Sequence, residues 1–106
     1  MDKRIKQLVN QIKENLIKLY GKKIKQIILY GSHVRGEVTR DSDIDVLVVV
    51  DDSLDPFEVR QSLSDTLFDI LLEERELVSV VAVPEHYFEN YDFPFILNVK
   101  REGILA

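Results

Sequence analysis

Two aspartates separated by a single residue are the feature of this sequence with the clearest chemical meaning. Asp43 and Asp45 begin an apolar run that continues to Val50. Because side chains alternate along a strand, the two carboxylates are predicted to project to the same face. Like charges at that range raise each other's pKa unless a cation lies between them. Oxygen ligands in a chain without cysteine favour Mg²⁺, with Mn²⁺ as the alternative, so Asp43 and Asp45 are predicted metal ligands.

A glycine and a serine that end the preceding apolar run form the second chemical element. Gly31 lets a phosphate approach the backbone, and Ser32 adds a hydroxyl and N–H groups that suit phosphate oxygens. If the two apolar runs pair as antiparallel strands, Gly31 and Ser32 lie at the same sheet edge as Asp43 and Asp45. A phosphate cradle that faces a metal site is what phosphoryl or nucleotidyl transfer needs.

Other phosphate and metal motifs do not fit this segment. A calcium loop that started at Asp41 would need glycine where Val46 stands and glutamate where Asp52 stands. The sequence contains no Gly-Lys-Ser or Gly-Lys-Thr, so the phosphate loop of many ATPases is absent, and so is a dinucleotide-binding glycine fingerprint.

Periodicity predicts the elements that position these residues. The predicted elements are a helix over 3–20 ended by Gly21, a strand over 24–30, a loop over 31–42 with a helical turn after Ser32, a strand over 43–50, a helix from Pro56, capped by Asp55, to about Arg75, a strand over 77–83, a short helix from Pro84 and a last helix from Pro94 to near Gly103. A strand, a crossover helix and a strand predict a parallel pair, with the aspartate strand in the interior of the sheet.

Composition limits the class of protein. The 106 residues predict a single domain over 1–106, and 45% hydrophobic residues suffice for a core. The absence of cysteine excludes disulfides and thiolate metal sites. No apolar run is long enough for a bilayer, which predicts a cytoplasmic protein without a membrane partner. Lys and Arg number 14 against 19 Asp and Glu, and the net charge of −5 argues against a nucleic-acid partner.

Gly31-Ser32, followed after ten residues by Asp43-Ile44-Asp45, resembles the signature of the minimal nucleotidyltransferases of the DNA polymerase β superfamily. The resemblance covers nearly the whole chain and implies an α/β (α+β) fold, the polymerase β-type nucleotidyltransferase fold, in which helices flank a small mixed sheet. It implies Mg²⁺-dependent transfer of a nucleoside monophosphate, AMP from ATP, to a hydroxyl. Asp43 and Asp45 would be the catalytic metal ligands, and Gly31 and Ser32 would contact the triphosphate.

The resemblance also extends to Arg35 and to a protein partner. Arg35 is expected to assist at the phosphates, and an ion pair with Glu37 or Asp41 is the equal alternative. Small members of the family are commonly paired with an all-helical HEPN-domain protein as antitoxin and toxin, and some attach AMP to a tyrosine of that partner. The resemblance therefore implies a HEPN-domain partner as the acceptor.

The sequence departs from the family at the third active-site carboxylate, which active members usually carry on the next strand. Ser79 and Val80 occupy the matching stretch, and Glu76 is the nearest substitute. This departure keeps an alternative open, in which a catalytically degenerate nucleotidyltransferase fold neutralises a partner protein by contact.

Two further predictions concern side-chain burial. The sequence concentrates five of its nine aromatic residues between Tyr87 and Phe95, and we expect Phe88 and Phe95 to enter the core. His33 lacks a ligand neighbour at metal-binding spacing, so we expect it to be solvated.

Overall fold

A four-stranded mixed sheet with strand order β3-β2-β1-β4 forms the centre of the computed structural model, which describes residues 2–106. The strands are β1 (Ile24–Tyr30), β2 (Ile44–Val50), β3 (Val78–Pro84) and β4 (Ile104–Leu105). β1 is antiparallel to both β2 and β4, whereas β2 and β3 are parallel. The predicted pairings of the first three strands and the interior place of the aspartate strand are therefore confirmed.

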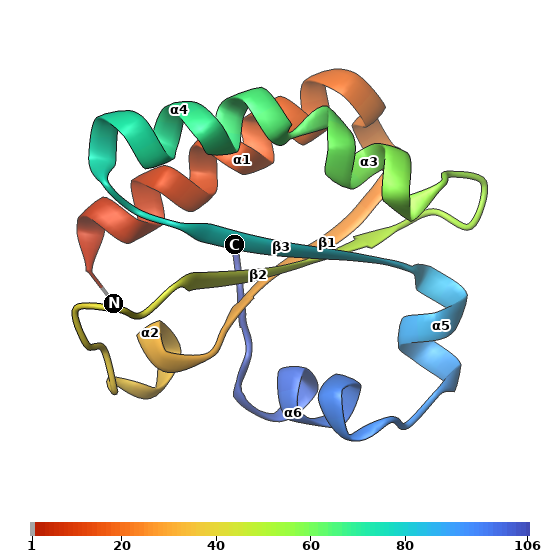
Figure 1. Cartoon of the computed structure of the whole chain (residues 1–106). Helices are drawn as coiled ribbons and strands as arrows, with labels where there is room; N and C mark the ends of the chain where they lie inside the picture. Colours follow the sequence, from red (N-terminus) through yellow and green to blue (C-terminus); the bar gives the residue numbers. More distant parts are fainter. Residues whose placement is uncertain (1) are drawn as a thin grey trace.

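Helices cover both faces of the sheet (Figure 1). One face carries α1 (Lys3–Tyr20), α3 (Pro56–Ser62) and α4 (Ser64–Glu74), and the other carries α5 (Glu85–Asn90) and α6 (Pro94–Glu102). A 3₁₀ turn (Gly21–Lys23) follows α1, and the short helix α2 (Ser32–Arg35) follows β1. This is the predicted architecture of a small mixed sheet flanked by helices.

β2 is buried on both faces, and its alternation fixes the direction of Asp45. Ile44, Val46 and Val48 pack in the cluster under α1, α3 and α4, whereas Leu47 packs with α5 and α6. Asp45 therefore projects to the side of the sheet that α5 and α6 cover.

The helix predicted from Pro56 to about Arg75 is in fact two helices that meet at Leu63. The Leu63 N–H donates to the carbonyl of Arg60, three residues earlier, and the Ser62 hydroxyl donates to the carbonyl of Val59 at 2.6 Å. Serine bonds of this kind compete with the helical ladder and bend helices. The apolar spacing remains helical across the junction, so periodicity alone does not reveal the break.

Several smaller predictions were wrong. β2 begins at Ile44 rather than residue 43, β3 runs over Val78–Pro84 rather than 77–83, so that Pro84 ends a strand, and β4 was not predicted. Phe88 is buried, as expected, but Phe95 is 41% exposed, with its ring edge-on to that of Tyr30.

Among residues 2–106, no helix is both long and apolar enough to cross a membrane.

Candidate active site

Gly31 and Asp45 are in direct contact at the edge where β1 ends and β2 begins. The antiparallel register sets Tyr30 opposite Asp45, and Gly31 follows with a φ of +83°. A Cβ atom added to Gly31 would lie 2.2 Å from Oδ2 of Asp45. The glycine of the predicted phosphate loop therefore leaves the space that the carboxylate of a predicted metal ligand fills.

The electrostatics of Asp45 indicate that the charge of Asp43 acts on its carboxylate. Burial raises the pKa of Asp45, and the charge of Asp43 raises it further, as does that of Glu102. Positive charge on His33 and Arg35 acts in the opposite direction. Because a bound cation would favour the ionised forms of both carboxylates, the donor set fits a divalent ion with oxygen ligands.

The α2 turn presents the other predicted site residues. Ser32 begins this turn, and the Gly31 carbonyl accepts hydrogen bonds from the N–H groups of Val34 and Arg35 at 3.0 and 3.1 Å. Arg35 donates through Nε to Glu37 at 3.1 Å, so the ion pair with Glu37 that the sequence offered as an alternative is present. The turn thus follows directly on Gly31, which lies beside Asp45, and brings the charge of Arg35 within range of that carboxylate.

Glu102 is a site residue that sequence reasoning missed. Its Oε1 atom accepts hydrogen bonds from the Gly31 N–H at 3.1 Å and from Nη1 of Arg35 at 3.2 Å. A backbone N–H beside a guanidinium is a donor set for anions, and here a carboxylate of the chain itself occupies it. The contact joins residues 71 positions apart, and no local pattern signals it.

The structure places a serine where the sequence departed from the family. Ser79 on β3 lies in register with Asp45 on β2. Glu76, the nearest substitute, accepts a hydrogen bond from Arg4 at 2.6 Å. Within residues 2–106, no group of three or more histidine, cysteine, aspartate or glutamate side chains is arranged to hold a metal ion.

We expected the His33 side chain to be solvated, whereas the structure half-buries it. Its Nε2 atom is buried, and within the described chain it has no hydrogen-bond partner. The side chain instead lines a hollow of about 330 Å³ that also has Asp43 in its wall. The other residues of this hollow are Val38, Thr39, Arg40, Asp41, Ser42, Leu71, Arg75, Glu76 and Leu77.

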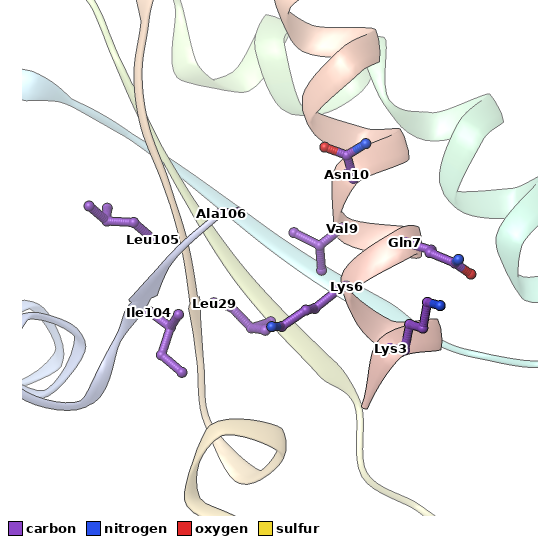
Figure 2. Close-up of a pocket in the computed structure, with 9 residues that line it drawn as sticks. All are labelled: Lys3, Lys6, Gln7, Val9, Asn10, Leu29, Ile104, Leu105 and Ala106. Carbon is purple, nitrogen blue, oxygen red and sulfur yellow. The ribbon is translucent and has the colours of Figure 1, made fainter. Parts of the chain in front are cut away.

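A larger hollow, of about 450 Å³, lies between α1 and the edge of the sheet formed by β1 and β4 (Figure 2). Lys3 and Lys6 of α1 line its helix side, and Leu29 of β1 and Ile104 of β4 line its strand side. It contains none of the predicted site residues, so we base the candidate site on the edge at Gly31 and Asp45.

Comparison with known proteins connects this geometry to a family. Residues 9–105 match the family model described as nucleotidyltransferase domain. A Methanocaldococcus jannaschii protein named "Putative protein adenylyltransferase" is 34% identical over 103 residues, which cover 96% of this chain and 93% of that protein. A second protein of that name and organism is 34% identical over 84 residues, which cover 78% of this chain and 82% of that protein.

Solved structures share the fold. A "putative nucleotidyltransferase" from Sulfolobus solfataricus superposes with a TM-score of 0.65 at 19% identity, over 96% of this chain and 78% of that chain. A toxin–antitoxin crystal structure with AMP-PNP gives a TM-score of 0.57 at 24% identity, over 90% of this chain and 69% of that chain.

Proposed function

Because the chain belongs to the nucleotidyltransferase domain family, we propose that it transfers AMP from ATP to a hydroxyl group of a partner protein. The observation that carries the proposal is the contact between Gly31 and Asp45, which joins a phosphate-binding turn to an acidic pair. Relatives named as protein adenylyltransferases support AMP as the transferred group.

Asp43 and Asp45 would hold Mg²⁺, or Mn²⁺ in its place. Magnesium sites commonly combine one or two protein carboxylates with phosphate oxygens of the substrate, which agrees with the two carboxylates present here. When bound, the ion would supply charge neutralisation at the phosphates.

The chain's own groups would bind and orient the triphosphate. The Gly31 N–H, the Ser32 hydroxyl and the Arg35 guanidinium are the donors, and phosphate oxygens would replace Glu102 on two of them. The acceptor oxygen would then bond to the α-phosphorus while the bond to pyrophosphate breaks, and the hydroxyl proton would pass to water. With Ser79 beside Asp45 and Glu76 bonded to Arg4, the chain would forgo a general base, a contribution of about 10²- to 10⁴-fold in typical enzymes.

We further propose a HEPN-domain toxin as the acceptor, with this chain, as one cytoplasmic domain over 1–106, in the antitoxin role. The shared fold with a chain of a toxin–antitoxin complex that contains AMP-PNP supports a nucleotide and a toxin as partners.

Replacement of both acidic residues tests the proposal. The double variant Asp43→Asn, Asp45→Asn is expected to lower transfer of labelled AMP to a co-expressed HEPN-domain protein by about 10³-fold or more, because the site loses its cation. In thermal melts, Mg²⁺ with a non-hydrolysable ATP analogue should raise the Tm of the wild type and not that of the double variant. Asp65→Asn, on α4, is the matched control. Unchanged transfer by the double variant would contradict the assignment.

A second candidate function, a catalytically degenerate module that neutralises a partner by contact, is favoured by Ser79 at the expected place of the third carboxylate. The same double variant separates the two functions. It would still neutralise the toxin if contact is sufficient, and it would fail to do so if AMP transfer is required.

A further inference from the structure

The hollow of about 330 Å³ beside Asp43 has no role in the binding of the triphosphate described above. Its walls include Asp43 and His33, but none of Gly31, Ser32 and Arg35. We propose that this hollow binds the segment of the acceptor protein that carries the hydroxyl, and that it selects segments with carboxylates beside that hydroxyl. The inference rests on the proposed transferase function and adds to it how the acceptor is recognised.

The position of the hollow suits an acceptor. In phosphoryl transfer the attacking and leaving oxygens lie roughly in line on opposite sides of the phosphorus. The phosphate donors Gly31 and Arg35 contact Glu102 of α6, on one side of the sheet. The hollow has Leu71 and Arg75 in its wall, from α4 and its end, and α4 covers the opposite face (Figure 1). An acceptor in the hollow would therefore approach Asp43 from the α4 side of the sheet, whereas Glu102 contacts the donors from the α6 side.

The size of the hollow and three apolar side chains in its mainly polar wall favour peptide side chains. Ligand pockets range from about 300 to 1,000 Å³, so this hollow is at the small end of that range. Val38, Leu71 and Leu77 line it and are 53%, 40% and 52% exposed. A bound peptide segment would remove these three side chains from water.

Two arginines give the hollow its charge selectivity. Arg40 and Arg75 line it, and neither has an ion-pair partner among residues 2–106, whereas Arg4 and Arg35 are paired with glutamates. The protein as a whole has a net charge of −5. The carboxylates of the same wall are Asp41, Asp43 and Glu76. Glu76 is paired with Arg4, and Asp43 would hold the cation, so the two guanidinium groups face the charge of Asp41 alone. They would attract carboxylates and repel a basic segment.

The backbone of Arg75 supports a role outside the helix. Arg75 ends α4 with a φ of +55° and is the one non-glycine residue with positive φ within the described chain. Where a helix ends with a residue in this conformation, that residue is usually glycine, because L-residues with a side chain adopt it at a cost in free energy. Glycine would therefore be easier to accommodate at this position, whereas the charge of Arg75 complements the helix C-terminus and its side chain lines the hollow.

The test is a peptide titration monitored by NMR, on full-length protein with Mg²⁺ and a non-hydrolysable ATP analogue. The probes are two blocked pentapeptides, Glu-Leu-Tyr-Leu-Glu and Lys-Leu-Tyr-Leu-Lys, each also made with serine in the central position. We expect the acidic peptides to shift the amide signals of Leu71, Arg75 and Leu77, and to bind at least about tenfold more tightly than the basic peptides.

Variants of the two arginines complete the test. Arg75→Gly and Arg40→Gln should each weaken the acidic peptides several-fold, and Arg75→Glu should reverse the preference. Arg60→Gln, on α3 outside the hollow, is the matched control and should leave the preference unchanged. Arg75→Gly should also keep or raise the Tm, since glycine accepts the positive φ, so that its loss of peptide binding is not a loss of folding.

Three results would overturn the inference. The first is equal binding of the acidic and basic peptides. The second is that no peptide at millimolar concentration shifts the amide signals of Leu71, Arg75 and Leu77, and the third is that the ATP analogue alone shifts these signals as strongly as a peptide does. The nucleotide is followed separately at the amides of Gly31 and Ser32. Absence of nucleotide binding there would contradict the proposed function, whereas failed peptide selection with intact nucleotide binding contradicts only the acceptor hollow.

Discussion

At the scale of single residues, Gly31 meets two demands that no other residue type satisfies together. Its φ is +83°, and a Cβ atom would approach Oδ2 of Asp45 to 2.2 Å. We expect Gly31→Ala to destabilise the fold by about 2–4 kcal/mol, of which about 1–2 kcal/mol is the left-handed backbone and the rest the displaced carboxylate. Mg²⁺-dependent nucleotide binding should be lost. Urea unfolding and fluorescence with a labelled ATP analogue measure the two effects.

Gly36 provides the control for this prediction. Its φ is +74°, but nothing lies within 4 Å of an added Cβ. Gly36→Ala should therefore show only the backbone cost, about 1–2 kcal/mol, and should keep nucleotide binding. Equal effects of the two substitutions would mean that the contact with Asp45 has no importance of its own.

Asp45 gives a prediction on pH. Because burial and Asp43 raise its pKa in the folded state, the folded chain binds this proton more tightly than the unfolded chain does. Stability is therefore lost as the pH rises from the pKa of Asp45 in the unfolded chain, about 3.9, through its higher pKa in the folded chain. Asp45→Asn should raise the Tm at pH 7 without metal, and the gain should shrink as the pH falls toward 4. A gain that persists unchanged at pH 4 would contradict this account of the charge.

At the scale of elements, α6 reaches the site through Glu102 in its last turn. The carboxylate accepts hydrogen bonds from Gly31 and Arg35 and raises the pKa of Asp45, so it opposes a triphosphate at the same donors. We expect Glu102→Gln to tighten ATP-analogue binding several-fold, as measured by calorimetry. Glu89→Gln, on α5, should leave affinity unchanged. Weaker binding by Glu102→Gln would instead mean that the carboxylate holds the donors in place for the nucleotide.

The elements also show which features a sequence can predict. Periodicity and alternation are local, so α1 was predicted with its observed bounds, and the edge shared by Gly31 and Asp45 followed from strand pairing. The junction at Leu63 depends on a serine bond that leaves the apolar spacing intact. β4 has only two residues, and the contact of Glu102 with Gly31 depends on how α6 and β4 pack against the rest of the chain. Apart from this local break at Leu63, the features that sequence reasoning missed are set by packing between distant parts of the chain.

At the scale of the whole molecule, net charge argues against a nucleic acid as the partner of this chain. Its net charge is −5, so binding to a polyanion would have few counterions to release. Lys3 and Lys6 of α1 line the larger hollow together with Leu29 of β1 (Figure 2). Two lysines beside an apolar hollow would release few counterions from a polynucleotide.

We therefore expect no measurable binding of tRNA or single-stranded DNA at physiological salt, which corresponds to a Kd weaker than about 10⁻⁴ M in fluorescence anisotropy. Lowering the salt should yield at most weak binding that Asp43→Asn with Asp45→Asn strengthens, because that change removes two negative charges. Tight binding of RNA that the same double variant weakens would place a nucleic acid at the aspartates and would make the acceptor a nucleotide hydroxyl instead of a protein side chain.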